Sequence, residues 1–257
     1  MQNKHSLGSI FAACGKSLLY FAIYFLAQVL AVLLVTFIVG SDYAEMLTVE
    51  ILIISSCISI LVFALFFKMR NASFSEEAYV NPFPPRFLLG IIVMGVSCAY
   101  AIAIVLGLIE QTGIIPESWI EAQNNTYSDV NLSTSLMQLL SVGIMAPLLE
   151  EILFRGLILG SLKKAMHPWV AIVLSAVAFG VAHGTPIGII YATGLGIIMG
   201  WIFVKFNSVL PSILFHMAYN CALSFSEGLS VLALVFSIPI LVLEIIDINK
   251  YFRGKQK

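Results

Sequence analysis

Ser17-LLYFAIYFLAQVLAVLLVTFIV-Gly40 is the stretch that decides the fold, because it runs over residues 17–40 without a single charged side chain. A helix rises about 1.5 Å per residue, so roughly 20 apolar residues cross a hydrocarbon layer of about 30 Å. Hydrophobic residues make up 60% of the 257-residue chain and charged residues 11%. Soluble domains usually contain roughly 25% charged residues. The sequence therefore predicts an all-α integral membrane protein.

Seven further apolar segments follow the first one. The eight predicted transmembrane helices cover residues 17–40, 47–67, 87–109, 135–162, 168–182, 187–204, 209–225 and 229–246. The fifth and seventh are short for a full crossing. We treat residues 1–257 as a single membrane domain, a polytopic helical bundle. Its parts are the first three helices with their loops (1–134), the helices with unusual polar residues (135–226), and the last helix with a basic tail (227–257).

Basic residues alternate along the chain in a way that sets the predicted orientation. With a cytoplasmic N-terminus, the inner segments carry Lys4, Lys16, Lys68, Arg70, Arg86, Lys163, Lys164, Lys205 and the basic residues of the C-terminal tail. The predicted outer loops carry acidic residues but neither Lys nor Arg. The positive-inside rule then places both termini in the cytoplasm, which requires an even number of crossings. The short loops and the lack of a targeting signal favour a bacterial cell membrane.

Two predicted loops are long and polar. One covers residues 68–86, and the other covers residues 110–134, part of which is expected to lie on the membrane surface around Trp119 and Tyr127. The net charge of −1 and the lack of a basic patch give no reason to expect a nucleic-acid partner. Membrane lipid is the expected surrounding, and the sequence does not indicate an oligomeric state.

The fourth predicted helix contains three charged side chains, Glu150, Glu151 and Arg155. A charge deep in hydrocarbon costs at least about 2.5–3.5 kcal/mol on insertion scales, so each such residue is a candidate for a functional role. Glu151 and Arg155 are four residues apart on one helix face and are predicted to pair. Glu150 points about 100° away. Without a partner in its own helix, Glu150 suits a general base or acid.

Two later helices add histidines and an asparagine. Phe179-Gly-Val-Ala-His183 closes the fifth helix, and His216-Met-Ala-Tyr-Asn220 lies within the seventh. Taken singly, each of these side chains reads as a hydrogen bonder between helices. Together with the charges of the fourth helix, they exceed what packing requires and predict one buried site. By its depth along the helix, His183 fits that site least well.

These three strings resemble the motifs of the CAAX protease and bacteriocin-processing family, also called the Abi family, which includes the type II CAAX prenyl endopeptidase. The resemblance covers about residues 147–225. It implies an intramembrane endopeptidase that cleaves membrane-associated or lipidated peptides. It further implies that Glu150 and His183 activate a water molecule, and that His216 and Asn220 stabilise the oxyanion.

The same resemblance implies that Glu151 and Arg155 orient the site. It leaves metal dependence open, because Glu150, His183 and His216 form a candidate zinc ligand set with a position left for water. The chain contains no His-Glu-x-x-His string, a helical pattern that binds zinc in many metalloproteases. A metal-free glutamate mechanism is therefore slightly favoured.

Two other functions remain open at the level of sequence. Buried Glu and His side chains also relay protons in transporters. A transporter built from inverted repeats would carry matching polar clusters in both halves, and the first three helices have no such cluster. A non-catalytic scaffold or a bacteriocin-immunity protein would keep the same fold. The sequence does not reveal whether the substrate is prenylated.

Overall fold

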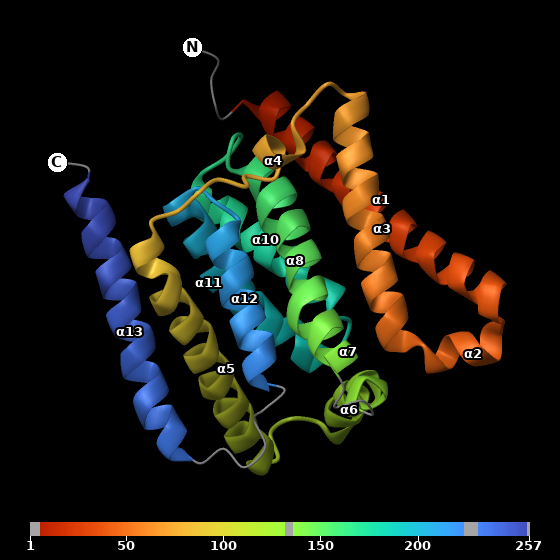
Figure 1. Cartoon of the computed structure of the whole chain (residues 1–257). Coiled ribbons are helices and arrows are strands. Elements are labelled where there is room, and N and C mark those ends of the chain that lie inside the picture. Colours follow the sequence, from red (N-terminus) through yellow and green to blue (C-terminus); the bar gives the residue numbers. More distant parts are fainter. Residues whose placement is uncertain (1–5, 132–135, 224–230, 256–257) are drawn as a thin grey trace.

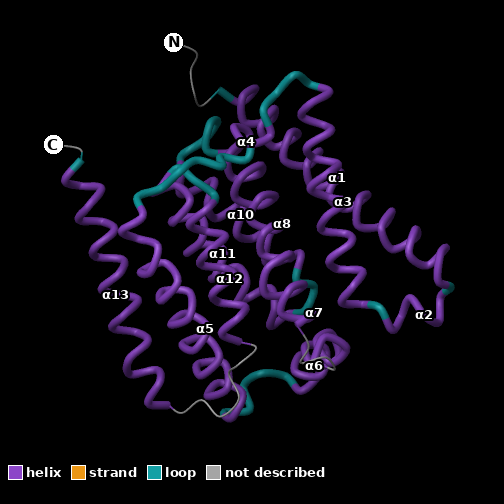
Figure 2. The backbone as a smooth tube through the Cα atoms, viewed as in Figure 1, coloured by secondary structure: helices purple, strands orange, loops and turns teal. Residues whose placement is uncertain are grey.

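The computed structural model describes residues 6–131, 136–223 and 231–255 (Figure 1). These residues form helices and short connections and contain no strand (Figure 2). The predicted all-α class is therefore confirmed for the described part of the chain. The helices pack side by side into one bundle, with small helices at its two ends (Figure 1).

Each predicted transmembrane segment corresponds to a helix or to a rod of successive helices. The separate helices are α1 (Leu7–Val39), α3 (Thr48–Met69), α5 (Leu88–Gln111), α10 (Pro168–Ala182), α11 (Pro186–Phe206), α12 (Leu210–Leu223) and α13 (Val231–Gly254). The fourth segment is a continuous rod, made of α7 (Leu136–Gln138), η2 (Leu139–Met145), α8 (Ala146–Glu151), η3 (Ile152–Leu159) and α9 (Gly160–Leu162). Predicted boundaries at residues 135, 225 and 229 lie outside the described residues.

The two outermost helices are longer than predicted. Helix α1 begins at Leu7 instead of Ser17, because the Ser6 side chain caps it by accepting a hydrogen bond of 3.2 Å from the Ser9 amide. Helix α13 continues to Gly254 instead of ending at residue 246. Hydropathy marks where a helix leaves hydrocarbon, whereas capping and end contacts decide where the helix itself stops.

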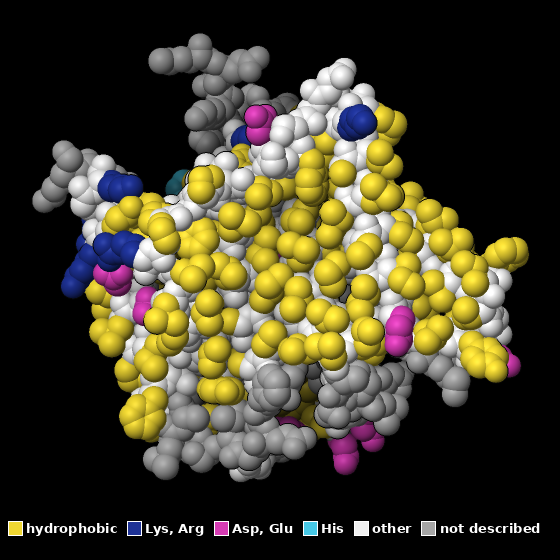
Figure 3. Space-filling view, in the orientation of Figure 1, with side chains coloured by type: hydrophobic (Ala, Val, Ile, Leu, Met, Phe, Trp, Pro, Cys, Tyr) yellow, Lys and Arg dark blue, Asp and Glu magenta, His cyan; other side chains and the backbone are white. Residues whose placement is uncertain are grey.

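The face of the bundle shown in Figure 3 is largely apolar. Phe37, for example, is 89% exposed. Among the described residues, four helices are both long and apolar enough to cross a bilayer, namely Leu7–Val39, Thr48–Met69, Pro85–Gln111 and Pro186–Phe206, and α10 is a shorter apolar helix. An extensive apolar surface on a helical bundle is stable when lipid covers it. The chain is therefore an integral membrane protein.

One end of the bundle, called the basic end here, carries Lys16, Arg86, Lys163 and Lys205. It also carries the connection between α3 and α5, which contains α4 (Phe74–Glu77) and η1 (Pro85–Phe87). Lys16 pairs with Glu77 at 3.0 Å, and Arg86 pairs with Asp247 of α13 at 3.0 Å. The Lys163 ammonium donates to the Asn207 side chain at 2.6 Å and lies 4.0 Å from the centre of the Tyr79 ring. These contacts fasten the α3–α5 connection to α1, to α13 and to the end of the rod.

The opposite end, called the acidic end here, carries α2 (Ser41–Met46), α6 (Glu117–Asn131) and the turn between α10 and α11 (Figure 1). Its segments contain Asp42, Glu117 and Glu121. The predicted loop 110–134 thus contains a helix, α6, on which Trp119 is 38% exposed. The side chain of Tyr127 lies outside the described part of the structure.

Helices α10 and α11 pack closely through glycine. A Cβ atom at Gly180 would lie 2.7 Å from the carbonyl oxygen of Ile189, which is closer than real Cβ atoms approach backbone. On α11, Gly194 has no such neighbour within 4 Å. Gly184, in the turn between the two helices, has a φ of +76°, a conformation that favours glycine. Small residues of this kind let membrane helices approach closely.

We expect Gly180→Ala to destabilise the protein by about 1–3 kcal/mol, because the added methyl group forces α10 and α11 apart. Thermal unfolding of the purified protein in detergent measures this change. Gly194→Ala is the matched control, since its methyl group enters open space. An equal loss of stability in both variants would contradict the close packing at Gly180.

Candidate active site

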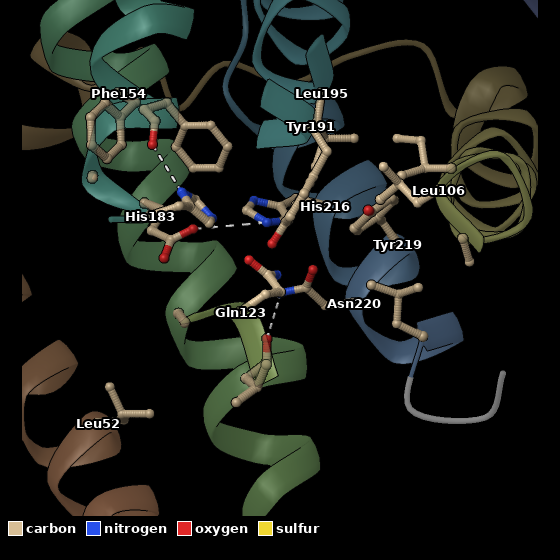
Figure 4. Close-up of a pocket in the computed structure, with 18 of the residues that line it drawn as sticks. Leu52, Leu106, Gln123, Phe154, His183, Tyr191, Leu195, His216, Tyr219 and Asn220 are labelled. Carbon is tan, nitrogen blue, oxygen red and sulfur yellow. Dashed lines mark hydrogen bonds and ion pairs between the residues drawn. The ribbon is translucent and has the colours of Figure 1, made fainter. Parts of the chain in front are cut away.

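A cavity of about 580 Å³ lies inside the bundle (Figure 4). Its walls come from α1, α3, α5, α6, the rod formed by α7–α9, α10, α11 and α12. The polar side chains that line it include Glu150, His183, His216 and Asn220. Four of the six residues predicted to form a site therefore face one common space.

Glu150 owes its position to the unusual geometry of the rod. Wide π-helical turns, η2 and η3, flank the short α-helix α8, which contains Pro147, Glu150 and Glu151. Proline has no N–H to donate to the preceding turn, and π-helical turns occur frequently at functional sites. The rod thus continues through Pro147 instead of breaking there. Helix α8 presents Glu150 to the cavity and Glu151 to the protein interior.

Glu151 is the centre of a buried network. Its Oε1 atom accepts a hydrogen bond of 2.8 Å from Arg155 Nη1 and one of 3.1 Å from His216 Nδ1. Glu151 and Arg155 are both 0% exposed, and neither lines the cavity. The predicted Glu151–Arg155 pair is confirmed. This pair lies directly behind His216 and fixes the orientation of its ring.

Phe179 connects this network to His183. The Arg155 guanidinium lies 4.2 Å from the centre of the Phe179 ring, a cation–π arrangement. The same ring meets the His183 ring edge-on at 4.6 Å and the His216 ring at 5.7 Å between centres. Phe179 is 0% exposed, so it serves as a rigid support for both histidines.

His183 follows the last residue of α10. Its Nδ1 lies 2.9 Å from the carbonyl oxygen of Phe179. A carbonyl oxygen can only accept, so Nδ1 carries the proton and Nε2 is the nitrogen left to act in the site. Depth along a straight helix had suggested that His183 fits the site poorly. The structure brings it to the cavity wall because α10 ends there.

The turn after His183 is held in place from two sides. The Thr185 side chain accepts a hydrogen bond of 3.0 Å from the Gly188 amide and thereby caps α11. The Thr185 hydroxyl also donates to the side chain of Gln123 on α6. The α6 helix is thus bonded to the segment that carries His183, and Gln123 itself lines the cavity.

His216 and Asn220 project from one face of α12, as their spacing predicted. His216 Nε2 lies 3.8 Å from Glu150 Oε2, which is longer than a hydrogen bond but within the range of an ion pair. The Asn220 side-chain amide donates to the carbonyl oxygen of Val142 at 2.8 Å. This contact holds the Asn220 side chain at the cavity wall.

The candidate zinc ligands do not form a metal site in this geometry. Within residues 6–131, 136–223 and 231–255, no three His, Cys, Asp or Glu side chains are gathered in a way that would hold a metal ion. Glu150, His183 and His216 share the cavity, but their ligand atoms do not converge on one point. We therefore derive no catalytic step through a metal.

Several cavity residues carried no signal in the sequence. Tyr24 and Leu52 come from the first two apolar helices, and Gln123 comes from the acidic end. A tyrosine within an apolar run and a glutamine in a polar segment look ordinary, because neither introduces a charge into hydrocarbon. Only the three-dimensional arrangement shows that residues before 135 complete the walls.

Residues 132–222 match the family model described as type II CAAX prenyl endopeptidase Rce1-like. The predicted family resemblance is confirmed. This matched segment contains all three motifs, including Glu150, His183 and His216. The match covers about a third of the chain and supports a membrane protease at the level of the family.

Two curated bacterial proteins are similar to the chain. It is 29% identical over 92 residues to the candidate membrane peptidase YdiL of Bacillus subtilis. The aligned residues make up 36% of this chain and 37% of that protein. It is 29% identical over 141 residues to the UPF0177 protein YxdF of Lactococcus lactis, which covers 52% of this chain and 72% of that protein. The match thus spans little more than a third of YdiL. No solved structure matches the chain.

We expect Arg155→Met to destabilise the protein strongly, by about 3–5 kcal/mol, because it leaves the buried Glu151 carboxylate without its cationic partner. The double variant with Glu151→Gln removes both charges and should recover much of the loss. Thermal unfolding in detergent reports both changes. Arg86→Met, which breaks the exposed pair with Asp247, is the control and should cost only about 0–1 kcal/mol. If Arg155→Met were as stable as Arg86→Met, the buried network around Glu151 would be contradicted.

Proposed function

We propose that this protein is an intramembrane endopeptidase in which Glu150 is the general base. The observation that carries the proposal is the position of this carboxylate. It faces a cavity enclosed by the bundle, together with His183, His216 and Asn220. A carboxylate within hydrogen-bonding reach of a bound water is the arrangement that general base catalysis needs.

In the proposed first step, Glu150 takes a proton from a water molecule, and the water oxygen bonds to the scissile carbonyl carbon. His183 orients this water through Nε2, since its Nδ1 is held by the Phe179 carbonyl. In the second step the C–N bond breaks, and Glu150 returns the proton to the leaving amine. Glu150 thus serves first as a base and then as an acid.

His216 and Asn220 are the proposed oxyanion donors. His216 Nδ1 donates to Glu151, so donation from Nε2 to the oxyanion requires that both ring nitrogens carry a proton. The Asn220 side chain, which also lines the cavity, is the second proposed donor.

We further propose eight membrane crossings with both termini in the cytoplasm. The helices and the rod lie where the eight predicted segments were, and α1 begins and α13 ends at the basic end (Figure 1). Lys and Arg are concentrated at that end, whereas residues 40–50 and 110–135 contain none. The positive-inside rule then assigns the basic end to the cytoplasm. The bacterial relatives favour a bacterial cell membrane.

The proposed substrates are membrane-associated or lipidated peptides. Apolar side chains line part of the cavity, among them Leu52, Ile102 and Leu106. A wall of this kind suits apolar side chains or a lipid group flanking the scissile bond. The site requires no metal in this proposal, and a zinc-dependent reaction would need the ligand atoms to rearrange.

We expect Glu150→Gln to abolish proteolysis while the protein still folds, because glutamine keeps the shape of the side chain but cannot accept a proton. Newly formed peptide ends in membranes that carry the wild type are compared with those in membranes that carry the variant at equal abundance. Glu110→Gln, at an exposed carboxylate, is the control. Identical sets of ends for the wild type and Glu150→Gln would refute the protease and favour a scaffold or a transporter.

We expect Asn220→Ala to lower kcat by about 10²–10³-fold with little change in KM, as the loss of one oxyanion donor does in other hydrolases. Initial rates on a peptide identified in the survey of new ends measure both constants. Thermal unfolding of the variant separates this effect from the loss of the contact with Val142. A change confined to KM would place Asn220 in substrate binding instead.

A further inference from the structure

The cavity is not centred between the two ends of the bundle. Its wall residues lie in the middle of the helices or toward the acidic end, and Phe154 of the rod reaches furthest toward the basic end. Leu52 lies in the second turn of α3, Leu106 in the last two turns of α5, Gln138 at the start of the rod, and Tyr191 in the second turn of α11. Leu223 is the last residue of α12, and His183 follows the last residue of α10.

Toward the basic end the bundle is solid. Leu159, Met199, Phe203 and Ser212 are all 0% exposed, and each lies between the cavity residues of its helix and the basic end. The Ser212 hydroxyl donates to the Met199 carbonyl at 3.1 Å, so α12 and α11 are bonded at this level. Fully packed interiors of this kind leave no path for water or a peptide.

The acidic end, in contrast, contributes a residue to the cavity itself. Gln123 belongs to α6, a polar helix outside the long apolar helices, and it both lines the cavity and accepts from Thr185. The cavity therefore reaches the surface segments at the acidic end. At the basic end, Lys163 is bonded to Asn207 and stacked on Tyr79 above the packed layer.

We propose that the catalytic cavity opens to the non-cytoplasmic face of the membrane, so that its substrate is a polypeptide segment exposed on that face. This inference rests on the proposed protease function and on the orientation given by the basic residues. A cytoplasmic chain end would meet the packed layer around Met199 and Phe203, which separates it from Glu150.

Sided labelling of single cysteines tests this proposal without requiring activity. Leu106→Cys places a thiol on the cavity wall, Ile114→Cys marks the acidic end, and Ser75→Cys marks the basic end. The wild-type chain, with its own four cysteines, gives the background. A small charged thiol reagent that does not cross membranes is added to spheroplasts and, separately, to inside-out vesicles of the same bacterial host. Variants are compared only when their thermal unfolding in detergent matches the wild type.

In spheroplasts we expect Leu106→Cys and Ile114→Cys to be modified and Ser75→Cys to remain at background, with the reverse in inside-out vesicles. If Leu106→Cys instead follows Ser75→Cys, or is modified from neither side, the proposed opening is wrong. If Ile114→Cys follows Ser75→Cys, the orientation is inverted and the proposal also falls.

The survey of new peptide ends separates this inference from the proposed function. Glu150-dependent ends that map to non-cytoplasmic segments support both. If the ends depend on Glu150 but map to cytoplasmic segments, the proposed protease function is supported and the proposed opening is contradicted. If Leu106→Cys is labelled from the non-cytoplasmic side but no peptide ends depend on Glu150, the proposed opening is supported and the proposed protease function is contradicted.

Discussion

The structure depends on one buried carboxylate that must be compensated inside an apolar bundle. Glu151 is fully buried and accepts from Arg155 at 2.8 Å and from His216 at 3.1 Å. A buried charge without partners is costly, so these contacts fix the position of α12 against the rod. Arg155 in turn stacks on Phe179 of α10 at 4.2 Å. The rod, α12 and α10 are separated in sequence, and this buried network joins them. Its central pair, Glu151 and Arg155, does not line the cavity.

The same contact explains why Glu150 is placed for chemistry and Glu151 is not. Adjacent residues on a helix point about 100° apart, so holding Glu151 in the interior turns Glu150 toward the cavity. Glu150 lies near the middle of the rod that runs from Leu136 to Leu162, at roughly 18–20 Å from either end along the helix axis. The Glu150 carboxylate, the proposed general base, therefore lies deep in the bundle, and its Oε2 atom is 3.8 Å from His216 Nε2.

Much of this arrangement could be predicted because charge in hydrocarbon is conspicuous. The helices lie within a few residues of their predicted ranges except at Leu7 and Gly254, where caps and end contacts extend them. The Glu151–Arg155 pair follows directly from their spacing. The bond from Glu151 to His216 and the support by Phe179 could not be predicted, because helix rotation and neighbour order leave no mark in a single sequence. The walls supplied by Tyr24 and Gln123 were hidden for the same reason.

An intramembrane protease has to bring water to a carboxylate without opening a path through the bilayer, and the uneven depth of the cavity meets both needs. Helix α10 ends at Ala182, well before the length of a full crossing, and the Gly184 turn leads into α11 at the cavity wall. Phe203 and Phe206, which lie closer to the basic end, are buried, so the proposed opening is confined to one half of the bundle. A short helix that was difficult to interpret as a crossing is thus the feature that delivers His183 to the site. The length of α10 and the position of the cavity are two consequences of the same geometry.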